Sequence, residues 1–354
     1  MAVTAETLQQ IADNRREIGQ LSDEQVRALV SQWTAAWDEL KPEYQASITE
    51  LLADAQDGYV SAAKIRANSR LKQALEVTRA QLDGLADAAN LTISAAIPEA
   101  VDLGGIGGVS LMGTQLPDFA TTGLVNTLTT WDMVDAESIA AIVERTTGRI
   151  EASTKPLPAD IARLMKRELI RGVSVGDNPR TTARRIISRT EGNFYGGLTR
   201  AMTISRTEML DASREGARTA SVANEDILEA WRWSADFSAR TCPACLSKNG
   251  TRFPVTAPGP EGHPNCRCAR VPVTKTWREL GFDIDEPADV FPDAEQWYDN
   301  LTDDTKARIM GRERMDLLNS GSIGFDDLST LKHNDDWRDS WQVTSIKKLR
   351  AKVA

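Results

Sequence analysis

The chain has 354 residues, of which 41% are hydrophobic and 26% charged, and its formal net charge is −9. This composition is ordinary for a folded soluble protein, and the length suffices for two or three domains. The acidic balance argues against bulk non-specific DNA binding, although a local basic face is compatible with it. No apolar run approaches the ~18–20 residues of a membrane helix, and the N-terminus lacks the apolar core of a signal peptide. We therefore expect no membrane partner and a protein made in the cytoplasm.

Residues 1–97 are predicted to form an N-terminal helical region. Apolar residues recur there at helical spacing, as in Leu8, Ile11, Ile18 and Leu21. Ser22 offers an N-terminal cap for a second helix, and Pro42 fits the first turn of a third. The pattern predicts a helical bundle or hairpin, with core packing as the plain role of its apolar residues.

The periodicity breaks in residues 98–120, which include the stretch GGIGG. The glycines lack the Lys-Ser/Thr of a phosphate-binding P-loop, so we predict a flexible, glycine-rich linker instead. Helical periodicity resumes at Leu124 and passes through Val134 and Ile142. Residues 121–156 are accordingly predicted to be a helical connector.

The next region, residues 157–275, begins with helices rich in basic residues. One apolar helix face is formed by Ile161, Leu164 and Met165, and Pro179 fits the start of a later helix. The basic residues between Lys155 and Arg218 include Arg163, Lys166, Arg167, Arg171, Arg180, Arg184, Arg185, Arg189, Arg200, Arg206 and Arg214. The plain interpretation is a solvated helix face. The alternative interpretation is that these residues contact DNA or an acidic protein surface.

Three short strands are predicted after these helices, at Leu228–Trp233, Thr251–Val255 and Ala269–Val273. Residues 276–354 are predicted to be a C-terminal helical extension, with helices at 294–310 and 313–319. The expected fold class is therefore mainly α with a small β-rich module, an α+β arrangement.

All four cysteines and one of the two histidines lie between the first and last of these strands. Cys242 and Cys245 form a C-x-x-C pair, and His263, Cys266 and Cys268 follow after a Gly- and Pro-rich loop. Two chelating pairs separated by a loop are what a tetrahedral metal needs, and thiolate and imidazole ligands favour Zn2+. Five candidates compete for four places: His263 and Cys266 are favoured beside the C-x-x-C pair, and Cys268 is the alternative fourth ligand.

Two disulfides or free thiols are the alternatives to a metal. Clustering of all four cysteines in one segment favours the metal over a disulfide framework. Glu261 lies near His263, but the chain has no H-E-x-x-H motif and no H-x-E with P-C-x-x-C. The sequence therefore predicts a structural zinc clip that substitutes for core packing in a small module.

The same stretch resembles a known family. RTE at Arg206–Glu208, WRWSAD at Trp231–Asp236, TCPAC, NGTRF, and HPNCRC followed by VPV occur in this order. Together they are similar to the phage Mu F-like minor head proteins, also called phage head morphogenesis proteins. The resemblance covers about Leu157 to Val273, and a weaker similarity continues from Ala294 to Leu328.

The resemblance implies a minor capsid protein of a tailed bacteriophage. Such a protein would associate with the portal protein or the major capsid protein during head assembly and DNA packaging or ejection. It would lie in the virion, in the head interior or at the portal vertex, and would act by binding without catalysis. A protease-type capsid maturation enzyme and a DNA-binding zinc module are the alternatives. Only His263 and His333 could serve a Ser-His-Asp set, and the metal already claims His263.

Overall fold

The computed structural model describes residues 3–53, 60, 62–117, 134–172, 179–334 and 338–353. The helices are α1 (Ala5–Ala53), α2 (Ala62–Ala67), α3 (Ser69–Ala95), α4 (Ile97–Gly113), α6 (Ala136–Thr154), α7 (Leu157–Gly172), α8 (Pro179–Ala223), α9 (Pro243–Lys248), α10 (Ala294–Asp299), α11 (Asp303–Met310), α12 (Arg312–Asn319) and α13 (Ile346–Val353). Short 3-10 turns at Glu225–Ile227 and Phe325–Leu328 precede strands. Among the described residues, no helix combines the length and apolar character needed to cross a membrane.

The strands form two small antiparallel sheets. β1 (Leu228–Ser234) lies between β2 (Arg252–Phe253) and β3 (Ala269–Thr274), and β4 (Ser329–Lys332) pairs with β5 (Ser340–Val343). The expected α+β class and the three predicted strands are therefore confirmed. The predicted C-terminal helices are also present, although the first of them is divided into α10 and α11. The extension is not wholly helical as predicted, because β4 and β5 also lie within residues 276–354.

The chain folds into two compact units. Unit 1 comprises Met1–Leu21, Ile97–Glu144 and Met209–Ala354, and unit 2 comprises Ser22–Ala96 and Arg145–Glu208. Both units are therefore interleaved along the sequence, and α1, α6 and α8 contribute residues to each. The domain limits predicted above describe a different division, and they stay a prediction.

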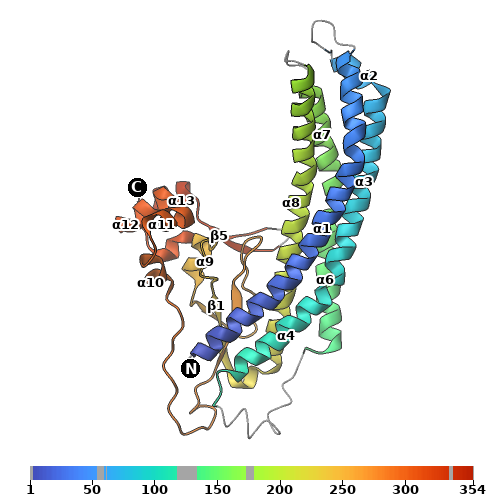
Figure 1. The fold of residues 1–354 in the computed structure, drawn as a ribbon. Helices are drawn as coiled ribbons and strands as arrows, with labels where there is room; N and C mark the ends of the chain where they lie inside the picture. The colour runs from blue at the N-terminus through green and yellow to red at the C-terminus, as the bar shows by residue number, and fades with distance from the viewer. Residues whose placement is uncertain are drawn as a thin grey trace. The chain divides into compact units, whose positions relative to one another are not determined.

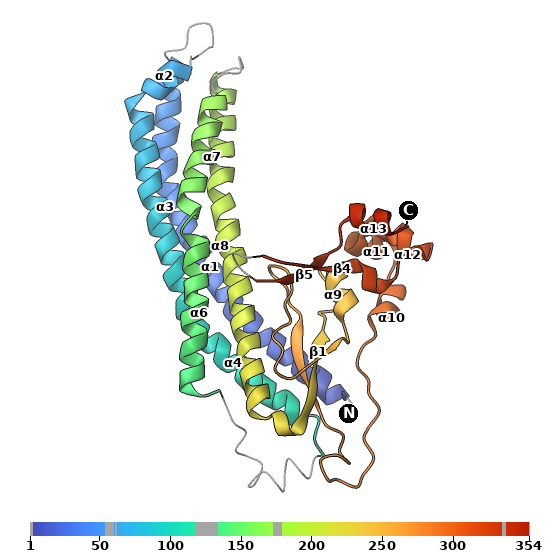
Figure 2. The same cartoon turned by 180° about the vertical axis from the view of Figure 1, so that it is seen from behind.

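Unit 2 is a bundle of long helices that run side by side (Figures 1 and 2). Its core is rich in aromatic residues: Trp37 of α1 stacks on Tyr44 and contacts Phe194 of α8, with ring centroids 6.1 and 5.2 Å away. Tyr44 shares a 2.6 Å hydrogen bond with Thr78 of α3. These contacts explain the Trp- and Leu-rich periodicity of the N-terminal sequence, since burial of such side chains stabilises a bundle by about 1.5–3 kcal/mol each.

The first helix is longer than expected. Ser22 and Pro42 were predicted to begin new helices, but both lie inside the 49-residue helix α1. A proline inside a helix costs about 3 kcal/mol. The buried residues around it, Trp33, Trp37, Leu40 and Tyr44, oppose that cost by packing. Tertiary packing therefore overrides the local start signals.

The predicted glycine-rich linker is wrong for residues 98–113, because α4 covers Ile97–Gly113, and residues 118–120 of that prediction lie outside the described residues. The physical reason is close helix packing. A Cβ atom on Gly104 would lie 1.9 Å from the carbonyl oxygen of Ser213 in α8, so only glycine allows the two backbones to approach this far. Asn14 of α1 also donates a 3.0 Å hydrogen bond to the Gly107 carbonyl of α4. In the predicted connector, α6 is confirmed, whereas residues 118–133, including Leu124, lie outside the described residues.

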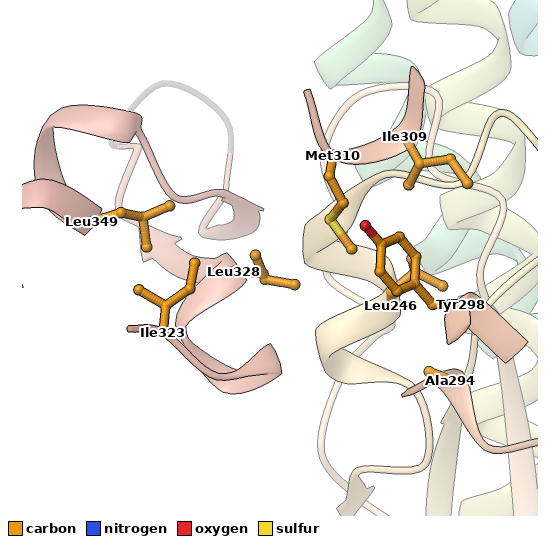
Figure 3. Packing of buried hydrophobic residues seen from close by; sticks show 8 residues of the cluster. All are labelled: Leu246, Ala294, Tyr298, Ile309, Met310, Ile323, Leu328 and Leu349. Atoms are coloured by element: carbon orange, nitrogen blue, oxygen red, sulfur yellow. The ribbon is translucent and has the colours of Figure 1, made fainter. Parts of the chain in front are cut away.

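The C-terminal extension has its own apolar core within unit 1. Leu246 of α9 is 1% exposed and belongs to the same cluster as Tyr298, Ile309 and Met310 (Figure 3). Leu328 and Leu349, from the turn before β4 and from α13, belong to it as well. The extension is thus packed against the short helix that carries the C-x-x-C pair.

Candidate metal centre

The C-x-x-C pair is held at the start of α9. Cys242 is the N-cap residue, with Pro243 at the first helical position. The Cys242 Sγ accepts a hydrogen bond from the backbone N–H of Cys245 at 3.4 Å. The first helical turn therefore brings both sulfur atoms to one side, while Leu246 points into the C-terminal core.

A tight turn presents the other candidate ligands. The Cys266 N–H donates to the His263 carbonyl at 3.0 Å, and Asn265 adopts a left-handed conformation with φ of 61°. A Cβ atom on Gly262 would lie 2.2 Å from the Cys266 Sγ, so glycine makes room for that sulfur. The His263 Nδ1 lies 2.7 Å from the Pro264 carbonyl, which leaves Nε2 to face the cysteines.

The structure places the five predicted ligands in two groups of three that share Cys245. The donor atoms of Cys242, Cys245 and His263 lie within 4.8 Å of one another, as do those of Cys245, Cys266 and Cys268. The Cys245 Sγ lies 3.5 Å from the His263 Nε2 and 3.7 Å from the Cys266 Sγ. Ligands bound tetrahedrally to one zinc ion at ordinary bond lengths lie about 3.5–3.8 Å apart. The donor types and these two distances therefore fit a zinc ion.

Two tryptophans of β1 support the cluster from one face of the sheet. Trp231 and Trp233, two residues apart, are each 1% exposed and pack with Cys245, Cys266 and Cys268. The Trp231 ring stacks on Phe253 of β2 at 4.5 Å. All four cysteines are free, and the 3.7 Å between the Cys245 and Cys266 sulfurs exceeds the ~2.05 Å of a disulfide. The disulfide alternative is therefore not realised in this structure.

The cluster favours thiolates at some positions. Hydrogen bonds from Cys245 and His263 lower the pKa of the Cys242 thiol to about 5, despite its burial. Hydrogen bonds from Cys245 and Cys268 hold the pKa of the Cys266 thiol well below its usual value, while burial is the largest cause that raises the pKa of Cys268. The Cys242 partner raises the pKa of His263 to about 9. Metal binding would displace that imidazole proton.

Other candidate residues lie outside the cluster. His333 is exposed and pairs with Asp339 at 2.7 Å near the C-terminal hairpin. Glu261 is half-buried, and burial raises the pKa of its carboxyl group. In the RTE motif of α8, Glu208 is buried in unit 2 and pairs with Arg149 of α6 at 2.9 Å.

Some of the basic residues between Lys155 and Arg218 are exposed, and at least one of them is buried. The solvated-face interpretation is confirmed for Arg163, Lys166, Arg167 and Arg200, whose side chains are exposed. It is wrong for Arg214, which is buried beside the metal loop, and sequence reasoning missed this role. The side chains of Arg171, Arg180 and Arg185 lie outside the described residues. The signal that could have found Arg214 is its helical i,i+3 spacing from Asp211, with which it pairs at 2.8 Å.

The model of the family described as "Phage Mu protein F like protein" matches residues 164–271. This range includes all five candidate ligands and ends before the C-terminal extension. The chain therefore carries a phage Mu F-like domain, the domain of a phage head morphogenesis family, as the sequence resemblance implied. The family suggests association with the virion and with other phage head components. No curated protein and no solved structure matches the chain.

Proposed function

We propose that this protein is a minor capsid protein of a tailed bacteriophage that associates with the portal region during head assembly and DNA packaging or ejection. The phage Mu F-like match over residues 164–271 is the observation that carries this proposal. It acts by binding, without catalytic turnover, in the head interior or at the portal vertex.

In this proposal the cysteine cluster holds a structural Zn2+. Cys242, Cys245, His263 and Cys266 are the favoured ligands, with Cys268 as the alternative fourth. A catalytic zinc site keeps one position open for water, whereas five candidate protein ligands, in two groups of three that share Cys245, lie at this site. Bound zinc would tie α9 to the turn at residues 263–268. A small sheet with few core residues gains folding free energy from such a tie.

The partner surface that we propose is a groove of about 560 Å3 in unit 2, between α3 and α7. Its apolar lining consists of Ile65, Leu71, Leu75, Ala159 and Ala162. Its charged lining consists of Lys72, Arg79, Arg163 and Lys166, with Glu76 as the acidic member. A groove lined by apolar and mostly cationic side chains complements an acidic amphipathic helix, which binds such grooves with its apolar face inward. We propose that the portal protein supplies that segment.

Charge reversal at the groove tests this proposal. The full-length chain and the portal protein are co-expressed and captured through a tag on the portal protein. Lys166→Glu should reduce the captured amount strongly, whereas the matched control Arg27→Glu, an exposed position on α1 outside the groove lining, should not. Equal capture of both variants would overturn the groove assignment. Weaker DNA retention by Lys166→Glu with unchanged portal capture would indicate a DNA-contacting surface instead.

A further inference from the structure

Arg214 of α8 is a buried cation whose hydrogen bonds reach the metal loop. Its Nε and Nη2 donate to the Cys268 carbonyl at 3.1 and 2.9 Å, and Nη2 also donates to the Cys266 carbonyl at 2.5 Å. Its Nη1 donates to Asp211 at 2.8 Å. A buried guanidinium is costly unless it is paired, so these partners are what keeps Arg214 in place. One side chain thus fixes the backbone of both cysteines in the C-R-C turn.

Asp211 connects Arg214 to the C-terminal extension. Its carboxylate accepts two hydrogen bonds from Arg338, from Nε at 2.9 Å and from Nη2 at 2.9 Å. The side chains of Asp211 and Arg338 are only 10% and 15% exposed. A bidentate ion pair that is shielded from water fixes the relative positions of its two side chains better than a surface ion pair does. Asp211 is therefore shared between a cation at the metal loop and a cation from residues beyond the family match.

The strand that follows Arg338 also contacts the metal loop. The Trp341 N–H of β5 donates to the Glu261 carbonyl at 2.8 Å, two residues before His263. The Trp341 ring packs against the cysteine cluster, and the Lys248 ammonium of α9 lies 3.5 Å from its centroid. The C-terminal hairpin thus contacts both α9 and the loop that carries His263. Arg214 holds the opposite end of that loop.

We infer that Arg214 positions the Cys266–Cys268 turn for metal binding, and that Asp211 and Arg338 make this positioning depend on docking of the C-terminal hairpin. The inference rests on the zinc site proposed above and adds a role for residues outside the ligand set. Partners of metal ligands typically change metal affinity by 10–100-fold when they are removed. The ion-paired chain from Arg338 through Asp211 to Arg214 is expected to act in this way.

The test measures metal retention in the full-length protein. Zinc transfer to a colorimetric chelator is timed for the parent and for Arg338→Leu, and Co2+ spectra report thiolate coordination. We expect Arg338→Leu to release zinc at least about tenfold faster and to give weaker thiolate–Co2+ absorption. Arg338→Lys, which keeps the charge but not the two-pronged geometry, should recover only part of the difference. The matched control is Arg350→Leu, which removes an exposed ion pair with Glu313 in the same extension.

The outcomes separate this inference from the zinc proposal. Zinc release from Arg338→Leu at the parent rate, with an unchanged Co2+ spectrum, would overturn the inference and leave the zinc site standing. Faster release from Arg350→Leu as well would show a general loosening of the extension and would also overturn it. A parent protein that takes up neither Zn2+ nor Co2+ would overturn both. Circular dichroism checks that each variant folds, and Arg338→Lys, which keeps a cation beside Asp211, replaces Arg338→Leu if the leucine variant does not fold.

Discussion

Replacing Gly104 by alanine tests the helix contact that the sequence concealed. The added methyl group would lie 1.9 Å from the Ser213 carbonyl oxygen, whereas an ordinary contact requires 3.4 Å or more. Helices α4 and α8 would therefore have to separate locally by about 1.5 Å, because a backbone atom cannot move aside as a side chain does. Overpacking of this kind costs about 1–3 kcal/mol and occasionally more. The better helix propensity of alanine returns at most about 1 kcal/mol.

We expect Gly104→Ala to lower the free energy of unfolding of unit 1 by about 1–2 kcal/mol, which corresponds to a decrease in Tm of roughly 2–8 °C. Thermal unfolding followed by circular dichroism and tryptophan fluorescence measures this shift. The matched control is Gly113→Ala at the end of the same helix, where an added Cβ meets no atom within 4 Å. That substitution should be neutral or slightly stabilising. If Gly104→Ala melts at or above the parent temperature, the close-packing account of α4 is refuted.

Three further predictions concern α4 and the metal module. A broad-specificity protease should spare residues 97–113 as well as it spares α3, because α4 is a packed helix; early cleavage there would indicate a linker after all. Leu246→Ala should cost about 2–5 kcal/mol, since this side chain is 1% exposed in the C-terminal core, and a denaturant titration with an unchanged midpoint would contradict that burial. Cys245→Ser should alter the fluorescence of Trp231 and Trp233 while most helical circular dichroism persists, because the bundle of unit 2 packs without the cluster. Unchanged tryptophan emission together with loss of a hydrolytic activity would refute the structural role of the site.

The sequence predicted which cysteine and histidine side chains lie close together, because the information that pairs them is local. Cys242 and Cys245 are brought together by one helical turn, and His263 and Cys266 by one tight turn. The close approach within each pair is therefore set only by the residues that lie between its two members. The alternating large residues of β1 likewise predict a strand, since Trp231 and Trp233 share one face by the two-residue period.

The errors arose where distant packing decides the local structure. The glycines of residues 104–108 have flexible-linker composition, yet α8 supplies a surface against which only a glycine-rich helix fits. Pro42 has the appearance of a helix start, but the aromatic core of unit 2 keeps α1 continuous through it. The roles of Arg214 and Arg338 were equally hidden, because 127 residues separate Asp211 from its second partner. The periodicity of apolar residues in a sequence does not reveal an ion pair between residues this far apart.

Zinc binding by the cysteine cluster is measured by elemental analysis combined with native mass spectrometry of the purified full-length protein. We expect one zinc ion per chain, lost on denaturation with a chelator, together with reduced thiols at Cys242, Cys245, Cys266 and Cys268. Protein from zinc-supplemented cells that contains no metal, has reduced thiols and takes up no Co2+ would contradict it.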